Sequence, residues 1–153
     1  MNYWLLKSEP GSYSIDDLKR DGKTCWSGVR NFQARNFLRD QIKKGDLTLF
    51  YHSNAEPSGV AGIARVTKEG YPDFTAWDKK DIHFDPGSTK EKPLWFMVDV
   101  EFVEKFPRFV SLEELKQDAA FRGMTVSQRG SRLSVQPVLK KHFKYVKAAA
   151  GRL

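Results

Sequence analysis

The chain has 153 residues, a mass of 17.6 kDa, 40% apolar and 29% charged residues, and a formal net charge of +7. This composition is typical of globular proteins, so a disordered tail protein is excluded and one domain over residues 1–153 is expected. No stretch approaches the ~20 apolar residues of a membrane span, so no membrane partner is expected.

The N-terminal segment and the cysteine content both favour a reducing compartment. Residues 1–7 have no basic lead before a short apolar run, unlike a signal peptide. Cys25 is the only cysteine, which excludes an internal disulfide framework and a multi-cysteine metal cage. We therefore expect a cytoplasmic protein.

The first elements in chain order are a strand and two helices. The apolar run 3–7 predicts a buried strand. Ser14 followed by Asp17 predicts a helix start, because an acid three residues after a hydroxyl cap stabilises the first turn. Residues 31–41 predict a second helix, since their apolar side chains recur at helical spacing.

The middle of the chain predicts two strands and a long loop. Residues 47–52 and 59–67 are expected as strands, and Gly59 and Gly62 are expected where another backbone approaches closely. Residues 69–93 combine three prolines with many charges and several aromatic residues. They predict an ordered loop that carries function.

The last third predicts two further strands and two helices. Residues 95–103 alternate apolar and acidic side chains, which indicates a half-buried strand. Ser111 predicts a helix start through about Asp118. Residues 132–136 alternate again, and Pro137 is expected in the first turn of a last helix. That helix is expected to bury three side chains: Leu139, Phe143 and Val146.

Strands outnumber helices and do not alternate strictly with them. This pattern favours an α+β fold with a curled, largely antiparallel sheet or small barrel surrounded by short helices. A doubly wound nucleotide-binding fold is disfavoured.

The basic charge is concentrated in two segments. Residues 119–153 hold eight of the 26 Lys and Arg residues and no acid, whereas residues 1–118 hold 18 basic and 19 acidic residues. A second basic cluster spans residues 23–44. Such clusters favour a polyanion-binding face, because phosphates release counterions on contact with cations. A solvated surface that keeps the protein soluble is the alternative interpretation.

The sequence lacks the common catalytic and cofactor motifs. Neither a Gly-rich phosphate loop nor a dinucleotide motif is present. A metal site at His52, His83 and Asp85 is disfavoured against ordinary surface roles. A nucleophile–base pair of Cys25 and His52 is disfavoured against a small buried thiol. We expect no cofactor, no metal and no catalytic residue.

Aromatic residues recur beside small polar residues at the predicted strand ends. A pocket for one nucleobase needs aromatic walls and a few fixed donors and acceptors. Trp26 and Trp95 are candidate walls, and Ser8, Asn31 and Ser53 are candidates for reading the base edge, together with backbone amides near Gly28. Burial of both tryptophans in the core is the alternative.

Five blocks in chain order resemble the EVE domain family. They are residues 3–10 (Tyr-Trp-Leu-Leu-Lys-Ser-Glu-Pro), 26–37, 50–54, 71–73 and 131–137. The resemblance implies a PUA-like fold, a small curled mixed β-barrel with flanking helices, and recognition of a modified base in nucleic acid. The sequence departs from the family pattern at Ser27, where the family usually has Asp. A weaker similarity to YTH domains implies an aromatic cage around Trp26 and Trp95.

These observations together predict a non-enzymatic reader that binds DNA or RNA carrying a modified cytosine or methylated adenine, and acts as a monomer. The predicted pocket consists of Ser8, Trp26, Ser27, Gly28, Val29, Asn31, Tyr51, His52, Ser53, Trp95, Leu133 and Ser134. The predicted phosphate contacts are Lys7, Arg30, Arg35, Arg132 and Lys140. The alternatives are a general PUA-type RNA-binding accessory protein and, less favoured, a small hydrolase or nuclease.

Overall fold

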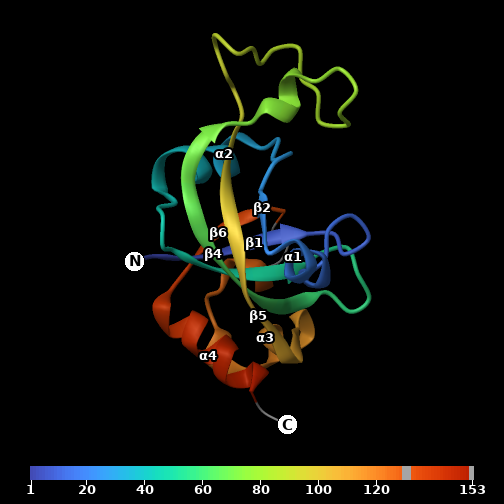
Figure 1. The fold of residues 1–153 in the computed structure, drawn as a ribbon. Helices are drawn as coiled ribbons and strands as arrows, with labels where there is room; N and C mark the ends of the chain where they lie inside the picture. Colours follow the sequence, from blue (N-terminus) through green and yellow to red (C-terminus); the bar gives the residue numbers. More distant parts are fainter. Residues whose placement is uncertain (129–131, 152–153) are drawn as a thin grey trace.

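A mixed sheet forms the centre of the computed structural model, which describes residues 1–128 and 132–151 (Figure 1). The sheet order is β2-β5-β4-β3-β1-β6, with β1 and β3 parallel and the other neighbours antiparallel. The strands are β1 (Tyr3–Ser8), β2 (Lys23–Cys25), β3 (Leu47–His52), β4 (Gly59–Pro72), β5 (Phe96–Ser111) and β6 (Val135–Val138).

Short helices surround this sheet. They are α1 (Ile15–Asp21), α2 (Phe32–Asn36) with the π-helical turn η1 (Phe37–Gln41), α3 (Leu112–Gln117) and α4 (Lys140–Ala150). Three 3-10 turns are η2 (Phe74–Trp77), η3 (Ala119–Phe121) and η4 (Thr125–Ser127). In the part of the chain that the structure covers, no helix combines the length and apolar character needed to cross a bilayer.

The sheet is curled because its longest strands are bulged. The register between β4 and β5 shifts at several points, and that between β3 and β4 shifts once. Bulges bend strands and increase their twist. The sheet stays open, with β2 and β6 at its edges. These features confirm the predicted α+β fold with a curled sheet, which is mixed and does not close into a barrel.

Alternation along the strands produces a hydrophobic core on each face of the sheet. On β1, Leu6 belongs to the cluster that includes Trp26 and Phe50, whereas Leu5 belongs to the cluster that includes Phe143. Neighbouring strand residues point to opposite faces, so both layers form from the same strands. Gly62 lies where β4 and β5 meet closely, since a Cβ atom there would come 2.3 Å from the Glu104 carbonyl oxygen.

Most predicted elements are present, with several differences. The predicted helix over 31–41 is α2 followed by the π-helical turn η1, and β4 and β5 are longer than expected. β2 has no counterpart among the predictions. Pro137 lies in β6 opposite Trp4 and does not open the last helix; β6 is an edge strand, where proline is tolerated. Leu139 is 59% exposed, whereas Phe143 and Val146 are buried as predicted.

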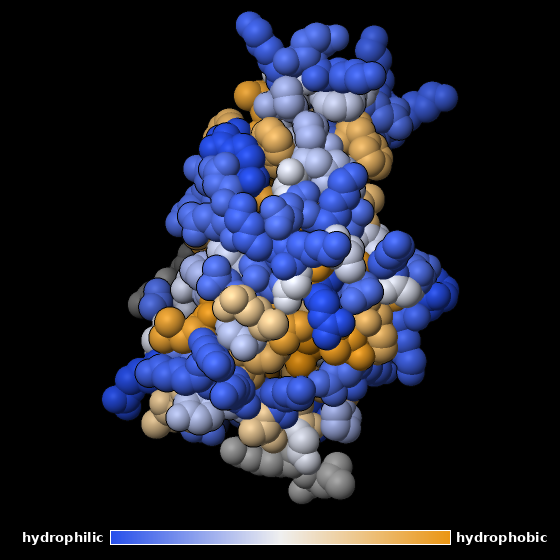
Figure 2. All heavy atoms as spheres, turned by 60° about the vertical axis from the view of Figure 1, so that its left-hand side comes forward, coloured by the Kyte–Doolittle hydropathy of each residue, from blue (hydrophilic) through white to orange (hydrophobic). Residues whose placement is uncertain are grey.

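A long loop, residues 73–95, connects β4 to β5 and projects from one end of the molecule (Figure 1). Figure 2 shows hydrophilic side chains covering this end, at the top of the view. α3 and α4 lie at the other end (Figure 1). The loop was expected to begin at residue 69, but pairing with β5 extends β4 to Pro72.

Candidate functional site

A cavity of about 1070 Å³ opens where β1 and β3 end. Its walls come from the segments 7–9, 12–13, 24–30, 53–54 and 82–83, together with residues 132 and 134. These segments are far apart in sequence, and the parallel pairing of β1 with β3 brings the ends of those two strands together. The volume matches the upper end of the ~300–1,000 Å³ range of small-molecule sites.

The cavity brings together many of the predicted site residues. The predicted residues that line it are Lys7, Ser8, Trp26, Ser27, Gly28, Val29, Arg30, Ser53, Arg132 and Ser134. Ser131, which belongs to the last block of the family resemblance, and two of the C-terminal basic residues, Arg129 and Arg152, lie outside the described residues.

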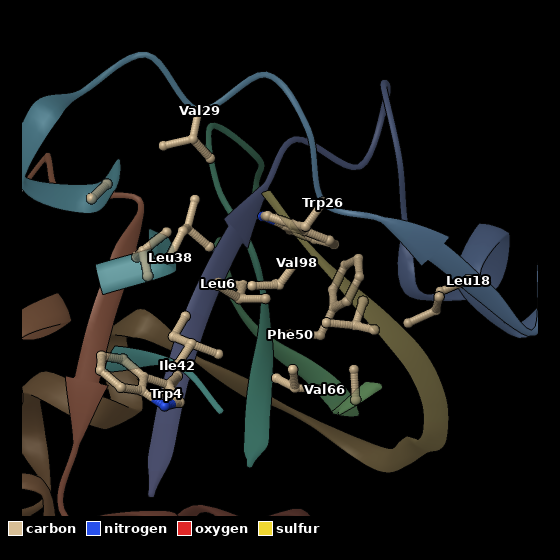
Figure 3. Packing of buried hydrophobic residues seen from close by; sticks show 14 of the residues in the cluster. Trp4, Leu6, Leu18, Trp26, Val29, Leu38, Ile42, Phe50, Val66 and Val98 are labelled. Atoms are coloured by element: carbon tan, nitrogen blue, oxygen red, sulfur yellow. The ribbon is translucent and has the colours of Figure 1, made fainter. Parts of the chain in front are cut away.

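Trp26 is both a core residue and part of the cavity wall. It is 8% exposed, and its ring meets Phe50 edge to face with the ring centroids 5.3 Å apart (Figure 3). Its backbone N–H donates to the Val98 carbonyl oxygen at 2.7 Å. Both interpretations of Trp26 therefore apply: the ring packs on Phe50 in the core and also borders the cavity.

Trp95 lies outside the cavity, which corrects the predicted pair of tryptophan walls. Its indole is 6% exposed and stacks on Phe32 at 4.7 Å. Its Nε1–H donates to Asp85 at 2.6 Å, and the Arg30 guanidinium lies 5.5 Å from the ring. Trp95 thus fastens the base of the 73–95 loop to α2, and only Trp26 of the two predicted wall residues lines the cavity.

Asn31 and His52 have structural roles outside the cavity. The Asn31 side chain caps α2 by accepting from the Ala34 N–H at 2.9 Å. His52 Nε2 accepts from the Ile15 N–H at 3.1 Å, so it supports the start of α1. Burial lowers the pKa of His52, which favours the neutral ring that this hydrogen bond requires.

The remaining predicted residues outside the cavity are Tyr51, Leu133, Arg35 and Lys140. Tyr51 is buried in the core cluster that includes Phe143, and Leu133 packs against the cluster that includes Trp26. Arg35 donates to the Leu94 carbonyl oxygen at 2.7 Å and covers the Phe32 ring. Lys140 is the first residue of α4, away from the cavity lining. Their predicted contacts with a base or phosphate gain no support from the cavity.

A buried carboxylate shapes the segment that carries Trp26. Asp73 accepts from the Gly28 N–H at 2.8 Å and from Arg30 Nη1 at 3.0 Å, and its other oxygen accepts from Thr75. Burial alone would raise the Asp73 pKa, but these donors outweigh it and hold the pKa below its ordinary value. The charged carboxylate therefore anchors the 26–30 segment to the end of β4.

Gly28 is required at its position by both conformation and space. Its φ of +83° favours glycine, and a Cβ atom there would lie 2.7 Å from the His83 ring. His83 therefore packs directly on the backbone of Gly28. This contact closes one side of the cavity.

Tyr13, Ile82 and His83 line the cavity and were missed as site residues. The Tyr13 carbonyl oxygen accepts from the Ser8 hydroxyl at 2.6 Å, and the Tyr13 hydroxyl donates to Asp21 at 2.9 Å. Burial and Asp21 raise the pKa of Tyr13 to about 12, so it stays neutral. Tyr13 is only five residues from Ser8, so its presence at the site could have been predicted from the sequence. Ile82 and His83 are far from the other lining residues in sequence, and only the fold brings them to the cavity.

Titratable and charged side chains line the cavity. Burial, with Asp99 nearby, raises the pKa of the Cys25 thiol and keeps it protonated. Across residues 1–128 and 132–151, no group of three or more His, Cys, Asp or Glu side chains is placed to hold a metal ion. Lys7, Arg30 and Arg132 instead put cations around a cavity that also contains an aromatic ring and hydroxyl groups.

The curled mixed sheet with its flanking short helices is that of a PUA-like domain. The sequence profile of the EVE domain matches residues 2–149, and the chain belongs to the EVE domain family. It is 44% identical to thymocyte nuclear protein 1 of Rattus norvegicus, over 95% of this chain and 72% of that protein.

Solved structures agree with this assignment. The human THYN1 protein in complex with 5-methylcytosine-containing DNA is 40% identical, with a TM-score of 0.92 over 100% of this chain and 99% of that one. The YTH domain of Zygosaccharomyces rouxii MRB1, in complex with N6-methyladenosine RNA, has a TM-score of 0.55 at 15% identity, over 99% of this chain and 88% of that one. That second likeness concerns the fold alone.

Proposed function

We propose that this protein binds nucleic acid by taking one modified base into the cavity beside Trp26, and that it does so as a reader without catalysis. The observation that carries the proposal is the cavity itself, which combines an aromatic wall, hydroxyl groups and a cationic rim. The human relative that binds 5-methylcytosine DNA supports the choice of ligand. One domain over the chain, a monomeric state and a cytoplasmic location remain expectations.

The roles of the lining residues follow from their chemistry. Trp26 supplies one stacking wall, and Tyr13 and His83 are the aromatic candidates for the opposite side. Ser27 can donate or accept a hydrogen bond, unlike the ionised Asp usual in the family. Lys7 and Arg132 are placed to contact phosphates, which orient a nucleic acid while the pocket selects the base. Arg30 was also predicted to contact phosphate, but its guanidinium donates to Asp73, Val29, Thr75 and His83 and so holds the cavity wall.

The test compares oligonucleotides that differ only in one 5-methylcytosine, by calorimetry. Trp26→Ala is expected to abolish the preference for the modified base, because stacking is worth about 1–3 kcal/mol per base. Trp4→Ala is the matched control, since Trp4 is similarly buried in the same core cluster but lies outside the cavity. A parallel pair with N6-methyladenine establishes which base the cavity selects.

Thermal unfolding must accompany this test, because Trp26 also packs on Phe50. Trp26→Phe keeps an aromatic ring and should keep part of the preference. A folded Trp26→Ala protein that still prefers the methylated oligonucleotide would contradict the proposal.

General binding of RNA is the second candidate function, favoured by the exposed lysines on α4. It predicts equal affinity for modified and unmodified oligonucleotides, together with a steep dependence on salt. The calorimetric comparison therefore separates the two functions directly.

A further inference from the structure

Ile82 is an apolar side chain held out at the mouth of the cavity. It is 91% exposed and lines the cavity next to His83. It occupies the second position of a turn that the Phe84 N–H closes on the Asp81 carbonyl oxygen at 3.0 Å. Turn positions favour polar residues and glycine, so local structure does not account for an exposed isoleucine here.

The turn that carries Ile82 is fixed to the cavity wall. The His83 N–H donates to Asp81 at 2.7 Å, and Arg30 Nε and Nη2 donate to the His83 carbonyl oxygen at 3.1 and 2.7 Å. Arg30 in turn pairs with the buried Asp73. Ile82 is therefore presented by an organised turn, which lowers the ordering cost of any contact it makes.

The surroundings of Ile82 suit a polyanion. Four exposed lysines lie on the same projecting loop: Lys79, Lys80, Lys90 and Lys92. Among the loop acids, Asp78, Asp81 and Asp85 accept hydrogen bonds from the loop's own backbone. The end of the molecule that bears this loop is covered by hydrophilic side chains (Figure 2). The loop that bears Ile82 thus also carries exposed cations that can contact phosphates.

We infer that Ile82 is a positioning residue that enters the base stack of a duplex at the place vacated by the base in the cavity, so that double-stranded DNA is the ligand class. This inference rests on the proposed function. A base in a duplex reaches a pocket only by leaving the stack, which costs unstacking and unpairing energy. Apolar wedges such as Ile offset that cost by filling the opened step. Ile82 is highly exposed and borders the same cavity, so it lies next to the place that an extruded base would occupy.

The test measures Ile82→Ala against duplex and single-stranded DNA, each carrying one 5-methylcytosine. The variant is expected to lose about tenfold or more in affinity for the duplex and to change little with the single strand, because only the duplex has a stack to open. Ile82→Leu should restore duplex binding. Leu139→Ala is the matched control, an exposed aliphatic residue at the start of α4.

A second measurement reports directly on the unstacking of bases in the duplex. With 2-aminopurine placed beside the methylated base, the unaltered protein should raise its fluorescence in the duplex, and Ile82→Ala should reduce that rise. Equal loss on both DNA forms, or no loss on the duplex, overturns the wedge. If the unaltered protein prefers the methylated single strand while Ile82→Ala leaves duplex binding intact, only the wedge fails. If it shows no preference in either form, the proposed function fails as well.

Discussion

At the scale of single residues, Asp73 shapes the cavity although it does not line it. It is fully buried, and its carboxylate joins the end of β4 to Gly28 and Arg30. A buried charge is tolerated only when it is paired and hydrogen-bonded, and both oxygens of Asp73 meet this requirement. The shape of the 26–30 segment therefore depends on a residue outside the cavity.

Asp73→Asn should lower the free energy of unfolding by about 1–3 kcal/mol, because it leaves Arg30 without its buried partner. Urea denaturation measures this change, and Asp40→Asn is the control: Asp40 pairs with Arg39 at the surface, so its substitution should change stability far less. Since the folded pKa of Asp73 is lowered, its contribution is present above about pH 4 and is lost as pH falls further. Equal effects of the two substitutions would contradict this role.

At the scale of elements, the start of α1 is stabilised both by neighbouring residues and by a residue distant in sequence. Ser14 and Asp17 form the predicted capping box, and His52 at the end of β3 accepts from the Ile15 N–H. α1 packs beside the loop that carries Ser8 and Tyr13, so the helix start helps to hold one wall of the cavity. His52, a titratable residue, thus helps to stabilise this wall of the cavity.

His52→Gln should reduce the loss of stability on mild acidification, because Gln cannot gain a proton. The folded pKa of His52 is lowered by burial, so the neutral ring supports α1 fully above about pH 6.5 and its contribution falls as pH drops through the folded pKa. His142 also has a lowered pKa, so the comparison needs a local probe. The Ile15 amide signal in NMR should shift with pH in the unaltered protein and stay constant in His52→Gln; a shift that persists in the variant would contradict this assignment.

Local signals predicted the elements well, and long-range contacts account for the errors. Ser14 and the alternation in residues 95–103 are visible within a few residues, so α1 and the start of β5 were predicted. Pro137 was misplaced because its strand depends on pairing with Trp4. For the site, strand ends indicated Trp26 and Ser8, but Trp95 is held by Phe32, which no local pattern shows.

Ile82 and His83 illustrate the limit for the candidate site. His83 reaches Arg30 across 53 residues of sequence, and its ring packs on Gly28. The loop was predicted to be ordered and functional, but no sequence pattern indicated that it packs against Gly28 and Arg30. Only the folded arrangement shows that this loop closes the cavity.

At the scale of the whole molecule, the cavity and α4 each carry a group of basic residues, in addition to the four lysines of the projecting loop. Lys7, Arg30 and Arg132 surround the cavity. The lysines of α4 lie at the end of the molecule away from the projecting loop (Figure 1). If the ligand enters the cavity, the group around the cavity should dominate the electrostatic part of the affinity and the group on α4 should contribute little.

Arg132→Ala should weaken binding to methylated and unmethylated DNA alike and reduce the slope of log affinity against log salt by about 1, because one phosphate contact is lost. Lys140→Ala is the matched control: it removes the same charge from a residue predicted to contact phosphate but placed outside the cavity. Titrations at several salt concentrations measure both slopes. Since the base in the cavity sets the preference and the rim only positions the strand, the ratio of the two affinities should stay constant in both variants. Equal slope changes would show that DNA extends along α4, and an altered ratio in Arg132→Ala would show that Arg132 contacts the base itself.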